Sequence, residues 1–580
     1  MTQSVTSIIP TPTLDPSLPR RYSDFDSLVD ALEYAAKGVR GCNFYDARGD
    51  ITDSVTWKEM RDRAETIGRK LVSMGFEKND RIALIAETSP DFIAFFLGCQ
   101  YASVLPVPMP LPTSFGAKEG YVGQLRIQME SCSANATMAP AFMAELMEDA
   151  TKGMDLKFVG SMEDYLAHDG MGDVRLPHLD DLTYLQYSSG STRFPHGVSV
   201  THRSLLSNTY GMGYHGVGLS ENDRCVSWLP FYHDMGLVGM FLTCLCSQTT
   251  VDFLATEAFA RRPITWLKIM SANKGTVSYS PTFGYEICAR RVRSDALDSL
   301  DLSTWRVAGN GGDMIRPNVM RQFAETFGPV GFSAKAFLPS YGLAECTLAV
   351  SFAKTNTGIE VDLVDENLLG GDEQVKVTES TNSDRMREVV NCGYPLPEYE
   401  IEIRTRDDKA LDECYIGRVC VRGESVMRDY YNDPETTAAV LSEDGWLDTG
   451  DMGYMRDGCI YIVGRAKDMI IVNGKNHWPQ DIEWAAEQVE GIRNGDAASI
   501  SVPGENDEEV PMVLVHCRLS DHEERAAFVA EIKSTIQKIT GVNTAVELVP
   551  PRSLPRTSSG KLSRAKARAN YLAGALKLTS

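Results

Sequence analysis

A loop rich in hydroxyl side chains lies near residue 190 and is suited to bind an anion. The segment Tyr187-Ser-Ser-Gly-Ser-Thr-Arg-Phe-Pro-His-Gly-Val198 directly follows an apolar run, Leu182 to Tyr187, which we expect to be a strand. Backbone N–H groups and hydroxyls in such a loop can surround phosphate oxygens. The segment lacks the G-x-x-x-x-G-K-[ST] pattern of the P-loop. Taken alone, a stretch of this composition is more often a surface turn.

Five further blocks of polar and glycine residues follow this loop in the chain. They are Trp228-Leu-Pro-Phe-Tyr-His-Asp-Met-Gly-Leu237, Ser340-Tyr-Gly-Leu-Ala-Glu345, Leu447-Asp-Thr-Gly-Asp451, Gly464-Arg-Ala-Lys-Asp468 and Pro555-Arg-Thr-Ser-Ser-Gly-Lys561. In this order the six blocks resemble those of the acyl-adenylate-forming superfamily, which includes acyl-CoA synthetases, luciferases and peptide-synthetase adenylation domains.

Within that superfamily the chain is most similar to the fatty acyl-AMP ligases. The similarity is carried by the block that ends at Leu237 and by Ile471-Val-Asn-Gly-Lys-Asn-His-Trp-Pro-Gln-Asp-Ile482. The stretch from Glu345 to Cys392 is long, and residues 351–376 resemble the insertion that marks these ligases. In that family the insertion is associated with failure to use coenzyme A.

The resemblance implies a two-step reaction. A fatty acid is activated by ATP, with Mg²⁺, to acyl-AMP with release of pyrophosphate. The acyl group then passes to the phosphopantetheine thiol of an acyl carrier protein or of a polyketide or peptide synthase carrier domain. Two alternatives stay open: a fatty acyl-CoA synthetase, and a non-catalytic adenylate- or lipid-binding protein. The intact Glu345, Asp451, Arg465 and Lys561 argue against the non-catalytic alternative.

The resemblance also implies three catalytic side chains. Lys561 would bridge the carboxylate and the α-phosphate and stabilise the charged transition state. Glu345 would be the Mg²⁺ ligand, which suits a hard cation that bridges phosphate oxygens. His233 would lie at the acyl end of the site. Each also has a non-functional alternative: Lys561 could be a solvated lysine, Glu345 an exposed acid and His233 a structural histidine.

The remaining implied roles concern the nucleotide and the movement of the domains. Phosphates would be bound by Ser188, Ser189, Gly190, Ser191 and Thr192, and the adenine by Gly309, Asn310 and Gly311 with Tyr341 and Gly342. Asp451 would accept hydrogen bonds from the ribose, although an acid in D-T-G-D can also stabilise a turn. Arg465 would reach the ribose or a phosphate, Lys467 matches the hinge position, and Gly474 belongs to the acceptor-side loop.

One position departs from the superfamily pattern. Family members often carry lysine where this chain has His196. A neutral imidazole would supply less positive charge beside pyrophosphate, which predicts slower adenylation or a substitute cation.

The elements that must position these residues follow from periodicity. Thr56-Trp-Lys-Glu59 is a capping box, and the helix it begins should end at Gly75. Strand and helix patterns alternate in the first half, which predicts parallel sheets covered by helices. After about Gly393 strands predominate, with a hairpin turn at Asp457-Gly458.

We therefore predict an α/β fold with two domains and a hinge. The N-terminal domain, residues 1–464, contains αβ-layered subdomains and a small β-rich subdomain. Residues 465–468 form the hinge, and residues 469–580 form a mobile α+β domain. The basic tail, formed by Lys561, Arg564, Lys566 and Arg568, is expected to be a solvated helix face or a docking site for an acidic carrier.

Composition argues against several other classes of protein. The 580 residues carry a net charge of −22, which argues against a nucleic-acid-binding protein. No apolar run is long enough for a transmembrane segment, because the stretch from Ile82 to Leu111 is broken by charges and prolines and is expected to be core. No secretory signal is seen near the first residue. The 13 cysteines form no C-x-x-C pair, so buried thiols and a cytoplasmic location are expected.

Overall fold

Helix α2 (Trp57–Ser73) begins at the predicted capping box. The hydroxyl of Thr56 accepts a hydrogen bond from the N–H of Glu59 at 3.2 Å, and the Glu59 carboxylate accepts one from the N–H of Thr56 at 2.9 Å. The apolar residues of one face of this helix, including Met60 and Leu71, are buried. Gly75 follows the last turn with φ of +82°, so the predicted end of the helix is confirmed.

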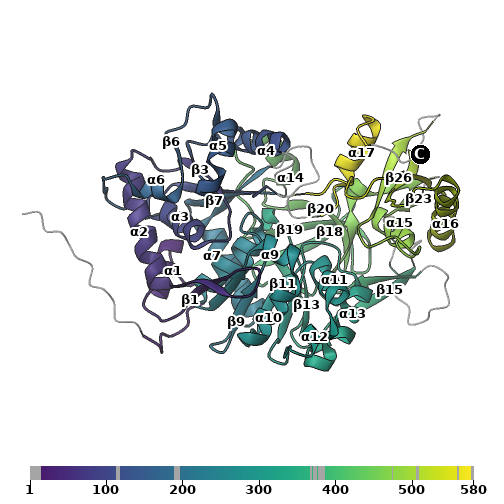
Figure 1. Cartoon of the computed structure of the whole chain (residues 1–580), viewed down its shortest axis with the longest axis horizontal. Coiled ribbons are helices and arrows are strands. Elements are labelled where there is room, and N and C mark those ends of the chain that lie inside the picture. The colour runs from purple at the N-terminus through teal and green to yellow at the C-terminus, as the bar shows by residue number, and fades with distance from the viewer. Residues whose placement is uncertain are drawn as a thin grey trace, which may run out of the picture. The chain divides into compact units, whose positions relative to one another are not determined.

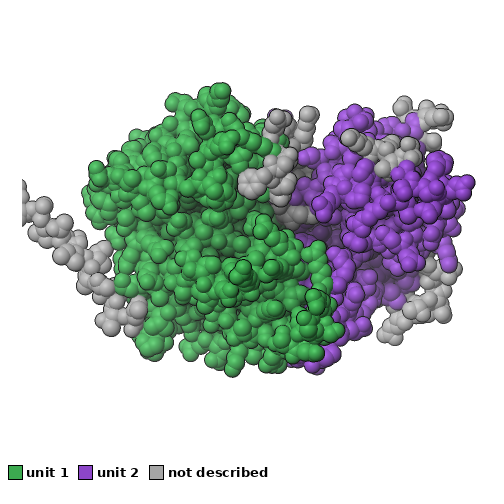
Figure 2. Space-filling model, viewed as in Figure 1, with its two compact units in different colours: residues 1–186, 199–279, 291–305 green, residues 187–198, 280–290, 306–580 purple. Residues whose placement is uncertain are grey.

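The computed structural model describes residues 15–112, 118–188, 196–365, 369, 375, 386–472, 475–504, 509–557 and 561–576. The chain divides into two units, which Figure 2 distinguishes by colour. Unit 1 comprises residues 1–186, 199–279 and 291–305, and unit 2 comprises residues 187–198, 280–290 and 306–580.

Unit 1 contains two parallel arrangements of strands (Figure 1). In one, the order is β4-β3-β5-β6, and all three pairings are parallel. In the other, β11, β9, β10 and β1 pair in parallel, and β2 adds an antiparallel edge. The bounds are β1 (Gly41–Tyr45), β2 (Ile51–Thr56), β3 (Arg81–Ile85), β4 (Leu105–Met109), β5 (Ala136–Met138), β6 (Phe158–Gly160), β9 (Arg224–Ser227), β10 (Thr250–Leu254) and β11 (Val277–Ser280).

The helices of unit 1 alternate with these strands, as predicted. They are α1 (Leu28–Ala35), α2, α3 (Pro90–Tyr101), α4 (Lys118–Ser131), α5 (Ala144–Thr151), α6 (Met162–Leu166), α7 (His202–Tyr210), α8 (Thr243–Cys246), α9 (Thr256–Arg261), α10 (Ile264–Ala272) and α12 (Ser294–Leu297). Helices α2 and α3 pack so closely that a Cβ atom added to Gly68 would lie 2.4 Å from the Cβ of Tyr101. The contact therefore requires glycine at this position.

The apolar stretch from Ile82 to Leu111 is core, as expected, and every residue of α3 except Asp91 is buried. Within the described part of the chain, no helix has the length and apolar character needed to cross a bilayer.

The chain passes from unit 1 into unit 2 along β7 (Leu182–Tyr187) and returns along β8 (Gly197–Thr201). Unit 2 then contributes β12 (Val307–Asn310), β13 (Phe337–Gly342), β14 (Ala349–Phe352) and β17 (Tyr394–Pro395) as neighbouring strands. Strands β12 and β13 are parallel, and the other two pairings are antiparallel. Helices α11 (Thr282–Arg291) and α13 (Pro317–Phe327) belong to the same region.

The predicted strand-rich region is an antiparallel sheet of four strands. Its strands are β18 (Tyr399–Arg404), β19 (Gly417–Gly423), β20 (Leu447–Arg456) and β21 (Cys459–Arg465), with α14 (Pro434–Val440) between β19 and β20. The last two strands turn at Asp457 and Gly458, both with positive φ, which confirms the predicted hairpin. Strand β15 (Val361–Asp365) lies within the predicted insertion, residues 351–376, and pairs antiparallel with β16 (Met386–Val390), which lies beyond it. Residues 366–368, 370–374 and 376 of the predicted insertion lie outside the described residues.

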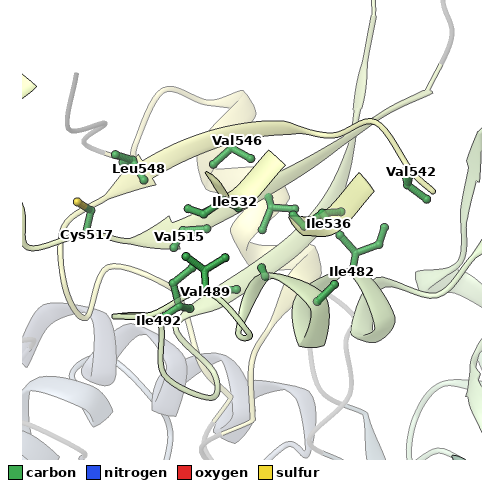
Figure 3. Packing of buried hydrophobic residues seen from close by; sticks show 14 of the residues in the cluster. Ile482, Val489, Ile492, Val515, Cys517, Ile532, Ile536, Val542, Val546 and Leu548 are labelled. Carbon is green, nitrogen blue, oxygen red and sulfur yellow. The ribbon is translucent and has the colours of Figure 1, made fainter. Parts of the chain in front are cut away.

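The C-terminal part of unit 2 is an α+β arrangement with its own core. Its elements are β22 (Ile470–Val472), β23 (Lys475–His477), α15 (Pro479–Ala486), β24 (Ala497–Pro503), β25 (Glu509–His516), α16 (His522–Thr540), β26 (Ala545–Val549) and α17 (Arg564–Leu572). Figure 3 shows Ile532 and Ile536 of α16 among Val515, Val546 and Ile482. The predicted α/β class with a small α+β end is confirmed. All 13 cysteines are free thiols, and all but Cys414 are buried.

Candidate active site

A cavity of about 340 Å³ in unit 2 brings together residues of four predicted blocks. It is lined by Ser340, Tyr341 and Gly342 of β13, Asp451 of β20, Gly464 and Arg465 of β21, and Lys561. These segments lie up to 221 positions apart in the chain, from Ser340 to Lys561, so the fold brings them together.

Asp451 lies at the centre of a polar triad on the wall of this cavity. Its carboxylate accepts a hydrogen bond from the Tyr341 hydroxyl at 2.8 Å and pairs with Nε of Arg465 at 3.1 Å. Burial raises the pKa of Tyr341 well above its usual value, and the charge of Asp451 adds to this effect. The charge of Asp451 also raises the pKa of Arg465. The triad therefore holds a negative, acceptor-rich carboxylate in a fixed position.

The predicted adenine turn is partly strand. Gly309 and Asn310 are the last residues of β12, because β12 pairs with β13 through Asn310. The side chain of Asn310 is fully buried and donates to the sulfur of Met320 at 3.1 Å. Gly312, the last residue of the Gly309-Asn-Gly-Gly312 turn, lines the cavity.

Lys561 is joined to Thr557 by two hydrogen bonds. The N–H of Thr557 donates to the carbonyl of Lys561 at 2.8 Å, and the N–H of Lys561 donates to the Thr557 hydroxyl at 3.2 Å. No carboxylate of the described residues forms an ion pair with the Lys561 ammonium. Its charge is therefore available to a ligand in the cavity it lines.

Glu345 lies in a 3₁₀ turn directly after β13 (Ala344–Cys346). One carboxylate oxygen accepts a hydrogen bond from the Tyr430 hydroxyl at 2.8 Å, and no described residue donates to the other oxygen. The described residues contain no cluster of three His, Cys, Asp or Glu side chains suited to a metal. A single free carboxylate oxygen fits a Mg²⁺ ion that takes its remaining ligands from substrate phosphates and water.

The phosphate-loop prediction is only partly covered by the described residues. Ser188 is buried, and its N–H donates to the carbonyl of His196 at 3.1 Å, which joins the two ends of the loop. Ser189, Gly190, Ser191 and Thr192 lie outside the described residues, as does Gly474 of the predicted acceptor-side loop.

His233 and Lys467 are not among the residues that line the cavity. His233 belongs to unit 1, where its Nδ1 lies 2.6 Å from a carboxylate oxygen of Asp234 and 3.2 Å from the N–H of Met235. Lys467 lies in the 3₁₀ turn Ala466–Asp468 that separates β21 from β22. The predicted roles of both residues stay predictions.

Sequence reasoning missed several residues of the site. Thr282 and Phe283 of α11 and Arg316, which caps α13, line the cavity, and Tyr430 holds Glu345. None of them belongs to a polar block, so no local pattern marks them. Arg556 also lines the cavity. It belongs to the block that ends at Lys561, and its position in that block could have marked it as a site residue.

Comparison with known proteins gives consistent relatives along nearly the whole chain. The model of the AMP-binding enzyme family matches residues 37–431. A protein of Caulobacter vibrioides with the provisional name acyl-CoA synthetase is 44% identical over 555 residues, which is 96% of each chain. The medium-chain-fatty-acid–[acyl-carrier-protein] ligase JamA of Moorena producens is 30% identical over 590 residues, 95% of this chain and 96% of that one.

A solved structure is similar over the same length. It comes from structural and functional studies of fatty acyl-adenylate ligases from E. coli and L. pneumophila. It has a TM-score of 0.92 and 42% sequence identity, and the match covers 96% of this chain and 100% of that one.

Proposed function

The chain belongs to the family of AMP-binding, adenylate-forming enzymes, and from this premise we propose that its acid substrate is a fatty acid and its final acceptor a carrier-protein thiol. ATP-dependent adenylation of an acid follows from membership of the family. The fatty nature of the acid is supported by the similarity to fatty acyl-adenylate ligases, and the carrier acceptor by the similarity to JamA.

One observation carries the proposal more than any other. The Lys561 ammonium, without a carboxylate partner among the described residues, lines the same cavity as the Asp451–Arg465–Tyr341 triad. A carboxylate that accepts hydrogen bonds suits the two ribose hydroxyls. A cation that lines the same cavity suits the α-phosphate and the incoming carboxylate. The cavity thus offers both poles that an adenylation reaction needs.

The proposed chemistry is an in-line displacement. A carboxylate oxygen of the fatty acid attacks the α-phosphorus of ATP, the bond from that phosphorus to the β-phosphate oxygen breaks, and pyrophosphate leaves. Both reactants are anions, so their approach is unfavourable without compensating charge. Lys561 and Arg465 supply fixed positive charge at the reacting centre, and this preorganisation lowers the barrier. Asp451 keeps the nucleotide aligned through the ribose.

Glu345 would hold Mg²⁺, which would neutralise the phosphate oxygens and orient the leaving pyrophosphate. The carboxylate offers one free oxygen for this purpose, since Tyr430 occupies the other. In the second step a thiolate attacks the acyl carbonyl, and AMP leaves with the bonding electrons.

The first test isolates Lys561. The variant K561A should lose acyl-AMP formation by a factor of about 10² to 10³, the cost of removing one preorganised charged contact from a transition state. Transfer from chemically prepared acyl-AMP should remain close to that of the wild type. The matched control is K538A, which removes an exposed lysine of α16. ATP–pyrophosphate exchange that is unchanged in K561A would contradict the proposed role.

The second test concerns the acceptor. Wild-type protein is incubated with ATP, Mg²⁺ and fatty acids of several lengths, with coenzyme A, with a phosphopantetheinylated carrier protein or with neither. We expect acyl-AMP to accumulate without an acceptor and acyl-carrier protein to form in the second mixture. Efficient formation of acyl-CoA would instead favour the acyl-CoA synthetase alternative, to which the name of the Caulobacter relative points.

A further inference from the structure

His196 stands at the end of the phosphate loop and is held by an acid from a distant segment. Its Nδ1 lies 3.1 Å from a carboxylate oxygen of Asp433. That aspartate is the N-cap of α14, where its other oxygen accepts a hydrogen bond from the N–H of Thr436 at 3.1 Å. A carboxylate is ionised at neutral pH, so Nδ1 of His196 carries the proton and donates it. The orientation of the imidazole ring is therefore fixed from one side.

The same imidazole ring packs against Tyr430. The two ring centroids are 4.9 Å apart, with an interplanar angle of 38°. Tyr430 is buried, and its N–H donates to the Thr437 hydroxyl at 2.9 Å, so its backbone is anchored to α14 as well. At its far end the Tyr430 hydroxyl donates to Glu345 at 2.8 Å. A continuous series of contacts thus joins Asp433, His196, Tyr430 and Glu345.

The geometry points to His196 as a positioning residue: we propose that its ring, held by Asp433, fixes Tyr430 so that Glu345 presents its free oxygen to the metal ion that accompanies the nucleotide phosphates. This inference rests on the proposed function. A lysine at position 196 would carry a charge but has no flat ring to pack against Tyr430. The histidine therefore serves through its shape and its hydrogen bond, and not as a weaker substitute for a lysine charge.

The experiment measures metal binding directly, so that it does not depend on turnover. Mn²⁺, which is paramagnetic, is titrated into the full-length protein with a non-hydrolysable α,β-methylene analogue of ATP, and free Mn²⁺ is read by electron paramagnetic resonance. The variants are Y430F, which removes the hydroxyl from Glu345, H196N, which keeps an N–H donor but no ring, and H196K. We expect each to weaken Mn²⁺ binding about ten- to hundredfold, the usual effect of losing a partner of a metal ligand.

Two matched controls test for general structural effects. Y454F removes a hydroxyl that donates to Asp362 at 2.9 Å in the interior of unit 2, and H516N alters a histidine that lies 2.9 Å from Asp496. Both should bind Mn²⁺ as the wild type does. Circular dichroism checks that each variant is folded, and the conservative Y430F keeps the test decisive if a His196 variant does not fold.

Three outcomes would overturn parts of this account in distinguishable ways. Wild-type metal affinity in H196N and Y430F would overturn the positioning role. Full affinity in H196K would show that charge, and not the ring, is what position 196 supplies. Failure of the wild-type protein to bind the ATP analogue at all would overturn the proposed function together with this inference.

Discussion

The carboxylate of Asp451 is held from two sides, by Arg465 and by the hydroxyl of Tyr341, and only 8% of its side chain is exposed. Replacing it with asparagine keeps the shape but removes the charge and one acceptor. A hydrogen bond to a charged group contributes about 1.5–3 kcal/mol. We therefore expect D451N to raise the Kd for ATP by about ten- to hundredfold, measured by isothermal titration calorimetry.

The control for this prediction lies three residues away on the same strand. Asp448 also pairs with an arginine, Arg418, but neither residue lines the cavity. D448N should leave the ATP affinity within a factor of two of the wild type. Equal weakening by both variants would mean that strand β20, and not the Asp451 carboxylate, is what matters.

His202, the first residue of α7, is a buried histidine that should make unit 1 sensitive to acid. Its Nδ1 accepts a hydrogen bond from the N–H of Leu28 at 3.1 Å, and burial lowers the pKa of the imidazole from 6.5 to about 4. In the unfolded chain the histidine takes up a proton as the pH falls below about 6.5, whereas the folded form resists until about pH 4. Stability is therefore lost as the pH falls through this window.

The size of this effect can be stated and tested. Between pH 7.5 and pH 5 the difference in protonation corresponds to about 2 kcal/mol of unfolding free energy, at about 1.4 kcal/mol per pKa unit. H202N keeps an acceptor for Leu28 but cannot titrate, so its urea unfolding should lose that much less stability over the same interval. The control H215N, at an exposed position in the following turn, should retain the wild-type pH dependence.

At the scale of elements, patterns that depend on a few neighbouring residues correctly predicted where a helix begins and where a hairpin turns. The capping box at Thr56 and the Asp457-Gly458 turn depend only on local hydrogen bonding and φ, and both are confirmed. Strand β4 was not predicted, because Pro106 and Pro108 lower the strand propensity of the segment. In the structure, pairing with β3 outweighs this low propensity. The burial of β4 was nonetheless expected from its apolar composition.

The pairing of Asp451 with Arg465 could not be predicted from local sequence patterns. Counting outward from the hairpin turn pairs Asp451 with Gly464. A bulge between Met452 and Gly453 shifts the register by one residue, so Asp451 faces Arg465 instead. The bulge has no signature in the sequence that we could use. The hairpin was predictable, but the contact that it creates in the site was not.

Helix α17 begins with an arginine that joins three elements. Arg564 forms a two-pronged ion pair with Glu483 of α15, at 2.7 Å for each contact, and its third nitrogen lies 3.1 Å from Asp468 in the turn after β21. This arginine follows Lys561 by three residues, so its ion pairs restrain the chain close to the lysine. The predicted solvated basic face of this helix is therefore wrong for Arg564.

Removal of this side chain should affect both stability and activity. R564M leaves two poorly exposed carboxylates without their partner, and we expect a loss of about 2 kcal/mol in unfolding free energy together with weaker adenylation. The control is R568M on the same helix. Arg568 is exposed and donates to the Ser501 carbonyl at 2.6 Å, so its removal should cost less than about 1 kcal/mol. Calorimetric or urea unfolding separates the two cases.

At the scale of the whole molecule, the division into units could not be read from the sequence. Residues 187–198 and 280–290 belong to unit 2 although the segments around them belong to unit 1. Such interleaving depends on which sheet each strand joins, and short apolar strands carry no information on their partners. The predicted swing of residues 469–580 about residues 465–468 stays a prediction.

Within unit 2, helix α15 is attached to preceding elements by buried charged contacts. Arg387 of β16 is 3% exposed, pairs with Asp481 at 3.1 Å and donates to the Val463 carbonyl at 2.8 Å. Arg316 pairs with Glu487 at 2.6 Å. The Trp484 ring contacts both guanidinium groups, at 5.1 and 5.5 Å from its centroid. These contacts stabilise an arrangement in which Lys561 and Asp451 line one cavity.

If adenylation uses this arrangement and thiol transfer uses another, weakening the contacts should affect the two half-reactions differently. R387M removes one partner of a buried pair, which costs about 3–5 kcal/mol in comparable cases and lowers the population of the arrangement that holds Lys561 in place. Single-turnover acyl-AMP formation should fall at least tenfold, while transfer from prepared acyl-AMP to the carrier thiol should not fall. The control R321M removes an exposed arginine of α13 that pairs with Glu388 on the same strand, and should leave both rates unchanged. Equal loss of both half-reactions in R387M would mean that Arg387 supports the fold of unit 2 and does not select between arrangements.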